Sequence, residues 1–200
     1  MKHIPRALIY ARLFIGVLIL AGSIFHIAHY NIIAVLLFSL GLLTDIFDGI
    51  IARRMNISTQ YLRRLDSTVD QVFFILVAAA TFAECPQFFY ANHVKLIILL
   101  SAEAAAYIIC FLKFRKEVAI HAISSKIWTL VLFATLVQIM FTCNAGLLFQ
   151  VCFYAGMLTR LEIIVIVILL RKWTNDVPSF YHAILLRQGK PIKRNKLFNG

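Results

Sequence analysis

Long apolar runs alternate with short polar segments along most of this chain. A helix needs about 20 apolar residues to cross the hydrocarbon core of a bilayer. Runs of that length predict six membrane-spanning helices, at 7–28, 32–53, 66–84, 94–112, 126–143 and 148–170. The connections leave no room for a soluble domain. The pattern therefore predicts an all-α membrane bundle over residues 1–170, followed by a polar tail over residues 171–200.

The basic residues lie almost entirely on one side of the predicted bundle. When the connections are assigned alternately to the two sides, eighteen of the twenty Lys and Arg residues fall on the side of the N-terminus. Basic connecting segments mark the cytoplasmic side of a membrane protein. We therefore expect a multi-pass protein of the cell (inner) membrane with both termini in the cytoplasm.

The net charge changes the expected partner. The formal net charge is +11, which in a soluble protein would suggest nucleic acid. Because 62% of the residues are hydrophobic, anionic lipid headgroups are the better match. Within the tail, the segment FYHAILL (180–186) is expected either to lie along the membrane interface or to form part of a loose tail.

The four cysteines do not have the spacing of a metal site. Cys110 and Cys152 lie in apolar runs and are expected to be small core residues. Cys85 and Cys143 are placed toward the outer side, where a disulfide between them is one possibility.

Two pairs of aspartates interrupt the apolar pattern. Asp45 and Asp48 are three residues apart near the end of the second predicted span, and Asp66 and Asp70 are four apart. Each spacing puts its pair on one helix face. The third span is expected to start near Leu65, on the side where the second span ends. All four carboxylates should then meet just below the cytoplasmic surface, which is where we expect the active site.

Carboxylates inside a membrane are costly and usually mark function. Four of them close together need neutralising cations, and Arg53 is the one cation in the immediate pattern. Oxygen ligands suit Mg²⁺ or Mn²⁺, and a pair of such ions stabilises the attacking and leaving oxygens of phosphoryl transfer. The alternative, helix capping or pairing with loop arginines, fits Asp66 alone. The cluster therefore predicts a two-metal site.

The segment between Asp45 and Asp70 resembles the signature of the CDP-alcohol phosphotransferases, D-x2-D-G-x2-A-R-x8-G-x3-D-x3-D. The matching positions are Asp45, Asp48, Gly49, Ala52, Arg53, Asp66 and Asp70. Leu62 stands where the family has glycine, close to the bound nucleotide. The opening IPRALIYAR (4–12) is similar to the start of phosphatidylglycerophosphate synthases, I-P-N-x-L-T-x-x-R.

The resemblance implies a phosphatidyltransferase that uses CDP-diacylglycerol and releases CMP. It implies that Asp45, Asp48 and Asp66 hold the two metals, and that Asp70 belongs to the same site and accepts the proton of the acceptor alcohol. It also implies a nucleotide-binding face and a homodimer. The face consists of Asp48, Gly49, Ala52 and Arg53.

The acceptor stays open among glycerol 3-phosphate, inositol phosphate and serine. A phosphorylated acceptor needs a cationic pocket. The candidates are Lys126, Arg160, Arg115 and Arg12. Lys126 starts the fifth span at the expected depth of the aspartates and is favoured, although an ordinary cytoplasmic-side charge explains it equally well.

Arg160 has two competing interpretations. It lies inside the sixth span at the depth of Glu103 in the fourth, so we expect either a structural ion pair with Glu103 or binding of an acceptor phosphate. Ala102 stands where phosphatidylglycerophosphate synthases usually carry arginine, which argues against glycerol 3-phosphate as the acceptor.

A divalent-cation transporter would also use carboxylates in a membrane. Its site should lie near the midplane, on broken helices or internal repeats. Here the predicted spans are unbroken and the aspartates gather at one side. The sequence therefore favours phosphatidyl transfer over transport.

Overall fold

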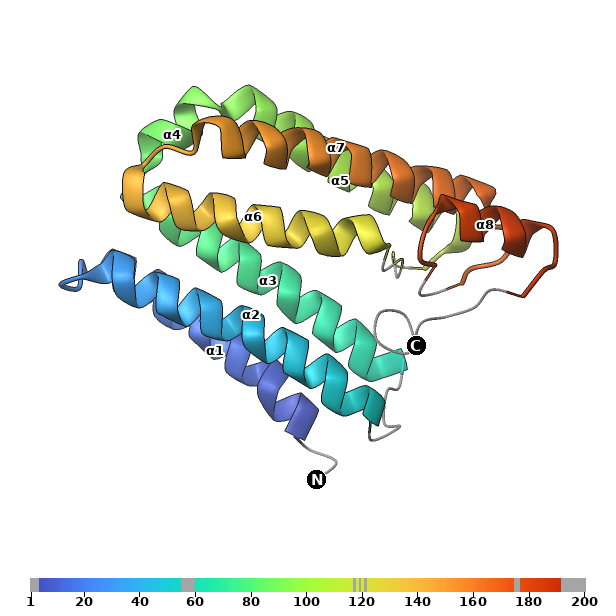
Figure 1. Ribbon diagram of the computed structural model, residues 1–200, viewed down its shortest axis with the longest axis horizontal. Coiled ribbons are helices and arrows are strands. Elements are labelled where there is room, and N and C mark those ends of the chain that lie inside the picture. Colours follow the sequence, from blue (N-terminus) through green and yellow to red (C-terminus); the bar gives the residue numbers. More distant parts are fainter. Residues whose placement is uncertain are drawn as a thin grey trace. The chain divides into compact units, whose positions relative to one another are not determined.

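The computed structural model describes residues 4–54, 60–116, 118, 120, 122–174 and 177–191 (Figure 1). Within these ranges every regular element is an α-helix. The side chains of residues 4, 5, 52–54, 60, 61 and 63 are outside this description. The all-α class that the apolar pattern predicts is confirmed.

Six of the helices are long and apolar enough to cross a membrane, as the pattern predicts. They are α1 (Ile4–Ile24), α2 (Tyr30–Arg54), α3 (Gln60–Glu84), α5 (His93–Phe114), α6 (Ile123–Thr142) and α7 (Gly146–Leu169). The largest difference from expectation is at α3, which begins at Gln60 rather than near Leu65. Gln and Arg are good helix formers, so the helix continues through polar residues that an apolar run does not include.

Two short helices complete the fold. Helix α4 (Pro86–Ala91) occupies the polar connection after α3, and α8 (Phe180–Arg187) forms within the predicted tail. Helix α8 packs against α7 and buries Ala183. The segment 180–186 is thus helical and packed, and its position along a membrane interface stays a prediction.

The chain forms two compact units. The first comprises Met1–Tyr90 and Leu136–Asn144, and the second comprises Ala91–Thr135 and Ala145–Gly200. In the first unit α1 packs against both α2 and α3. In the second unit α5 packs against α7, and α7 packs against α8.

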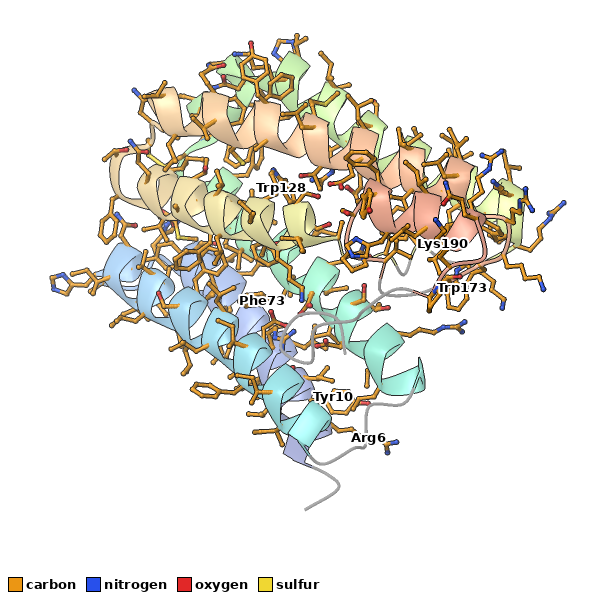
Figure 2. The ribbon with its side chains drawn as sticks, turned by 45° about the vertical axis from the view of Figure 1, so that its right-hand side comes forward. Arg6, Tyr10, Phe73, Trp128, Trp173 and Lys190 are labelled. Carbon is orange, nitrogen blue, oxygen red and sulfur yellow. A yellow bond between two sulfur atoms is a disulfide. The ribbon has the colours of Figure 1, made fainter. Side chains whose placement is uncertain are left out.

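Small residues let the helices of the first unit approach closely around Phe73, which points from α3 into the bundle (Figure 2). A Cβ atom added to Gly16 of α1 would lie 3.0 Å from the Phe73 ring, and one added to Gly41 of α2 would overlap it. Phe73 is 1% exposed and its ring packs on Phe38 and Phe74. The Phe73 side chain therefore fixes the spacing of three helices.

A disulfide joins Cys85 and Cys143 in the first unit, with the two Cα atoms 5.2 Å apart. Cys85 directly follows α3, and Cys143 directly follows α6. The possibility that these two cysteines pair is thus realised. Cys110 and Cys152 are free and buried, as expected of core residues.

Candidate active site

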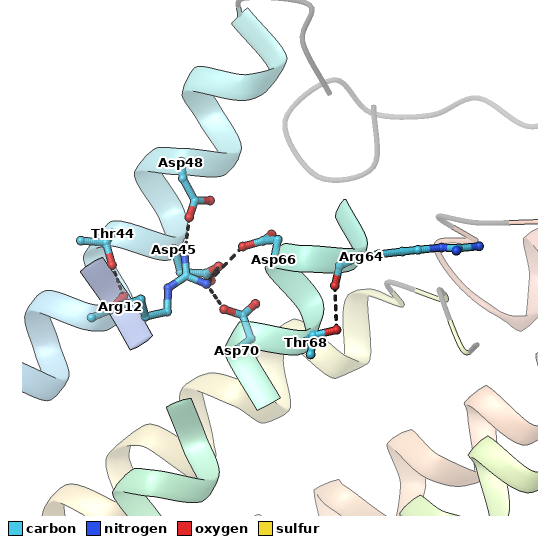
Figure 3. Close-up of polar contacts among 9 residues, drawn as sticks. Arg12, Thr44, Asp45, Asp48, Arg64, Asp66, Thr68 and Asp70 are labelled. Atoms are coloured by element: carbon cyan, nitrogen blue, oxygen red, sulfur yellow. Dashed lines mark hydrogen bonds and ion pairs between the residues drawn. The ribbon is translucent and has the colours of Figure 1, made fainter. Parts of the chain in front are cut away.

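The four aspartates of the first unit surround one arginine of α1 (Figure 3). Asp45 and Asp48 project from α2, and Asp66 and Asp70 project from α3. Arg12 reaches between them from α1, and its side chain is 1% exposed. Three consecutive helices thus contribute to a single charged cluster.

The guanidinium group of Arg12 contacts all four carboxylates. Its Nη1 lies 3.1 Å from Asp45 Oδ1 and 3.2 Å from Asp66 Oδ1, and it also contacts Asp70. Its Nη2 contacts Asp48 Oδ2. Arg12 Nε is buried and has no hydrogen-bond partner among the described atoms. The arginine is thus held by its two terminal nitrogens alone.

The four carboxylates differ in their access to solvent. The Asp48 side chain is 3% exposed, whereas Asp45, Asp66 and Asp70 are each about a third exposed, at 35%, 30% and 32%. The cluster therefore has a buried wall at Asp48 and an open side at the other three residues. A water-soluble group can reach it from the open side.

The charges of the cluster do not balance. When ionised, the four carboxylates carry four negative charges, and the contacting arginine carries one positive charge. At 4 Å two unit charges interact by about 4 kcal/mol in a medium of intermediate dielectric constant, so the excess repulsion is substantial. Additional cations would relieve this repulsion.

The ligand atoms fit a divalent metal ion. Asp45, Asp48 and Asp66 each offer a carboxylate oxygen, and these oxygens lie within 4.8 Å of one another. Hard divalent cations prefer such oxygen donors. The cluster can therefore hold Mg²⁺ or Mn²⁺ between α2 and α3.

The local structure places these carboxylates on continuous helix. Because α3 starts at Gln60, Asp66 and Asp70 lie beyond its first turn, and capping of a helix start does not explain Asp66. Thr44 Oγ1 donates to the backbone oxygen of Gly41 at 2.6 Å, and the neighbouring Asp45 contacts Arg12.

Leu62, which replaces the glycine of the family pattern, has a packing role. It is 8% exposed and lies in an apolar cluster with Ile9 of α1 and Val69 of α3. Leu13 and Leu65 pack against the same cluster. Beside the aspartates, this contact between α1 and α3 keeps Arg12 next to the carboxylates.

The structure brings together the four predicted aspartates and adds Arg12, which the sequence reasoning missed as their partner. The sequence indicates Arg12 only as an acceptor-binding candidate. Its place inside an apolar run, at a depth matching that of the aspartates, was the available signal. Arg53, the cation expected near the cluster, lies with Ala52 in α2, but the side chains of both are outside the described part. Gly49 is half-buried on α2.

The other two predicted site residues belong to the second unit. Lys126 is half-buried in the first turn of α6, and Arg160 is buried in α7. Arg160 Nε donates to Glu103 Oε2 at 2.6 Å, which confirms the expected ion pair. The guanidinium carbon also lies 3.6 Å from the centre of the Trp128 ring. Acceptor binding by Lys126 and Arg160 stays a prediction.

The second unit has further polar contacts near these residues. Glu162 accepts a hydrogen bond from Ser124 Oγ at 2.5 Å and one from the backbone nitrogen of Phe180 at 3.2 Å. It therefore connects the starts of α6 and α8 to α7. Arg160 Nη1 and Ser125 Oγ are buried without a hydrogen-bond partner among the described atoms.

Comparison with known proteins adds one match. The family model described as CDP-alcohol phosphatidyltransferase matches residues 2–168, which include Arg12, the four aspartates and all of the six spans except Leu169. No curated protein and no solved structure matches the chain.

Proposed function

The chain belongs to the CDP-alcohol phosphatidyltransferase family, and from that premise we propose that it transfers a phosphatidyl group from CDP-diacylglycerol to a small alcohol. The family consists of transferases that act on alcohol acceptors and release CMP. The chain is therefore an enzyme of this class, and this membership favours phosphatidyl transfer over divalent-cation transport. The observation that carries the proposal is the convergence of four aspartates from α2 and α3 on one point.

The metal-binding role is assigned to these aspartates. Asp45, Asp48 and Asp66 would hold divalent cations, with Asp70 on the edge of the same site. When bound, two Mg²⁺ or Mn²⁺ ions neutralise the diphosphate of the substrate and the charge that develops on the leaving CMP. The nucleotide is proposed to lie along Asp48, Gly49, Ala52 and Arg53 on α2.

The reaction forms one bond and breaks one at phosphorus, and it transfers one proton. The hydroxyl oxygen of the acceptor attacks the phosphorus that carries the diacylglycerol, and the bond from that phosphorus to CMP breaks. Asp70 accepts the hydroxyl proton. The protein contributes mainly by holding the reacting groups in line and by stabilising charge, as in other phosphoryl transfers.

The geometry of α3 supports a cytoplasmic active site. Asp66 and Cys85 lie at opposite ends of this helix, about 28 Å apart at 1.5 Å per residue. Disulfides persist in oxidising compartments and are rare in the cytosol. With the Cys85–Cys143 disulfide on the outer side of the inner membrane, the aspartates face the cytoplasm. CDP-diacylglycerol suits this place because its tails are lipid and its nucleotide is water-soluble.

The acceptor is proposed to be a small alcohol, with glycerol 3-phosphate, inositol phosphate and serine as candidates. Lys126 and Arg160 are the proposed contacts for an acceptor phosphate. The ion pair with Glu103 uses Nε of Arg160 and leaves Nη1 without a partner among the described atoms, which is compatible with a second role. The homodimer and the binding of anionic lipid headgroups by the basic tail stay predictions.

The direct test is CMP release by the purified protein. CDP-diacylglycerol and Mg²⁺ or Mn²⁺ are supplied, and the three candidate acceptors are added one at a time. We expect CMP with one acceptor and none in EDTA. No CMP with any acceptor, together with cation flux in liposomes, would overturn the proposal.

A second test concerns the base. Asp70→Asn should abolish turnover, because the acceptor proton has no destination, and should leave nucleotide binding largely intact. Binding of labelled CDP-diacylglycerol measures the second property. Loss of binding together with turnover would remove Asp70 from the role of base.

A further inference from the structure

Arg12 donates to the same group of carboxylates that would bind the metal. Its Nη1 lies 3.1 Å from Asp45 and 3.2 Å from Asp66, and its Nη2 contacts Asp48. These three aspartates supply the oxygens that lie within 4.8 Å of one another. The guanidinium group therefore has the ligands and the location of a bound cation (Figure 3).

A divalent ion would compete with this guanidinium group for the same carboxylates. Asp45 and Asp66 would have to offer carboxylate lone pairs to such an ion, and some of these lone pairs now accept from Arg12. Both groups are positively charged, and Arg12 is 1% exposed, so water screens their repulsion weakly. Arg12 and the metal thus oppose each other at these oxygens.

Arg12 also has a function in the absence of metal. Four carboxylates from two helices repel one another, and the planar group of Arg12 contacts every one of them. Buried charges are costly unless they are paired, so a tethered cation keeps the metal-free site folded. Burial of Leu62 against Ile9 and Val69 helps to hold α1 in position for this contact.

We propose that Arg12 is a positioning residue that acts as an internal substitute for the metal. It holds the four aspartates together in the metal-free enzyme and gives up carboxylate contacts when divalent metal binds. Metal binding is then an exchange of one cation for another, and Arg12 weakens the apparent metal affinity. This inference rests on the proposed metal-dependent function and concerns a residue outside the aspartate motif.

The test compares Mn²⁺ affinity in the wild-type protein and in Arg12→Gln, without substrate. Free Mn²⁺ is followed by electron paramagnetic resonance during a titration. We expect Arg12→Gln to bind Mn²⁺ at least about 10-fold more tightly, because the competing cation is gone. A merely structural arginine would give the opposite result, since its loss would disorder the ligands and weaken binding.

Arg64→Gln is the matched control. Arg64 lies on α3, one turn before Thr68, and its side chain is exposed and points away from the carboxylates (Figure 3). The Arg64→Gln substitution removes one positive charge, as Arg12→Gln does, but from a side chain that does not contact the four aspartates. Its Mn²⁺ affinity should remain within about 2-fold of the wild type, and a 10-fold gain there as well would reduce the effect of Arg12 to overall charge.

A second variant covers the case in which Arg12→Gln does not fold. Arg12→Lys keeps one positive charge but loses the planar group that contacts carboxylates on two helices, so its affinity should lie between those of the wild type and Arg12→Gln. If the folded Arg12 variants bind Mn²⁺ no more tightly than the wild type does, the proposed exchange of Arg12 for metal is wrong. If none of the proteins binds Mn²⁺, the wild type included, both the exchange and the proposed metal site are wrong.

Discussion

Two buried arginines lie in different charge environments in the two units of this protein. Arg12 contacts four carboxylates, whereas Arg160 pairs with one carboxylate of the described residues, that of Glu103, and stacks on the ring of Trp128. The second arrangement balances one charge with one charge. The first, when its carboxylates are ionised, leaves an excess of negative charge that further cations would balance. The difference separates a cluster with excess negative charge from an ion pair whose two charges balance each other.

The comparison makes opposite predictions for the removal of a carboxylate. In the Arg160 pair, a lost carboxylate leaves a buried cation without its partner. In the Arg12 cluster, a lost carboxylate removes repulsion but also a metal ligand. Loss of the carboxylate that pairs with Arg160 should therefore change function and stability in the same direction. Loss of a carboxylate that contacts Arg12 should change them in opposite directions, because turnover falls while the stability of the metal-free protein rises.

The largest expected effect is on turnover. Asp66→Asn should lower the rate of CMP release by about 1000-fold or more, equivalent to about 4 kcal/mol, because it removes a proposed metal ligand. The measurement is steady-state CMP release over a range of Mn²⁺ concentrations. Compared with the wild type, Asp66→Asn should need a higher Mn²⁺ concentration for saturation and should have a lower rate at saturation.

Glu84→Gln is the control for this prediction. Glu84 is the last residue of α3, at the opposite end from Asp66, and the substitution makes the same change of charge. We expect turnover within about 2-fold of the wild type. Equal losses in the two variants would mean that the effect comes from the charge of α3 rather than from the cluster.

The next effect concerns the balanced pair. Glu103→Gln should lower the free energy of unfolding by about 1–3 kcal/mol, because it leaves the charge of Arg160 without its ionic partner. Thermal unfolding in detergent measures the change, with and without Mn²⁺. The loss should be the same in both conditions, since no metal is proposed at Glu103. If Mn²⁺ restores the stability that Glu103→Gln loses, the Glu103–Arg160 pair responds to metal as the Arg12 cluster is proposed to do, and the contrast between them is wrong.

The sequence predicts the six spans because bilayer thickness imposes a length on apolar runs, and it predicts the four aspartates because helical spacing places each pair on one face. It missed Arg12 as their partner, since which face of α1 meets α2 and α3 depends on packing. Contacts such as Phe73 against Gly16 and Gly41 decide that packing, and they leave no periodic signal. The start of α3 was placed too late because polar residues extend the helix beyond its apolar run.

Packing around Phe73 gives a third prediction. Gly41→Ala should lower the free energy of unfolding by about 1–3 kcal/mol, because the added methyl group overlaps a ring that is already in contact with Phe38 and Phe74. The double variant Gly41→Ala/Phe73→Leu should recover part of the loss. Thermal unfolding of both variants is the measurement. The absence of any recovery would show that Phe73 is not the obstacle.

The smallest effect has the opposite sign. Asp45→Asn should raise the unfolding temperature in EDTA by a few degrees, which corresponds to about 1 kcal/mol. The substitution removes one attraction to Arg12 but also the repulsions from Asp48 and Asp66, whose oxygens lie within 4.8 Å of an Asp45 oxygen. The repulsions lost outnumber the attraction lost, so the metal-free protein gains stability while turnover falls.

Saturating Mn²⁺ should reverse this order. A ligand that binds only the folded protein stabilises it in proportion to the logarithm of its concentration relative to the dissociation constant. The wild type would bind Mn²⁺ with a full set of carboxylates, so its unfolding temperature should rise above that of Asp45→Asn. If Asp45→Asn is already less stable than the wild type in EDTA, the Asp45–Arg12 contact is a balanced pair like Glu103–Arg160, and the excess charge ascribed to the cluster is not felt by the folded protein.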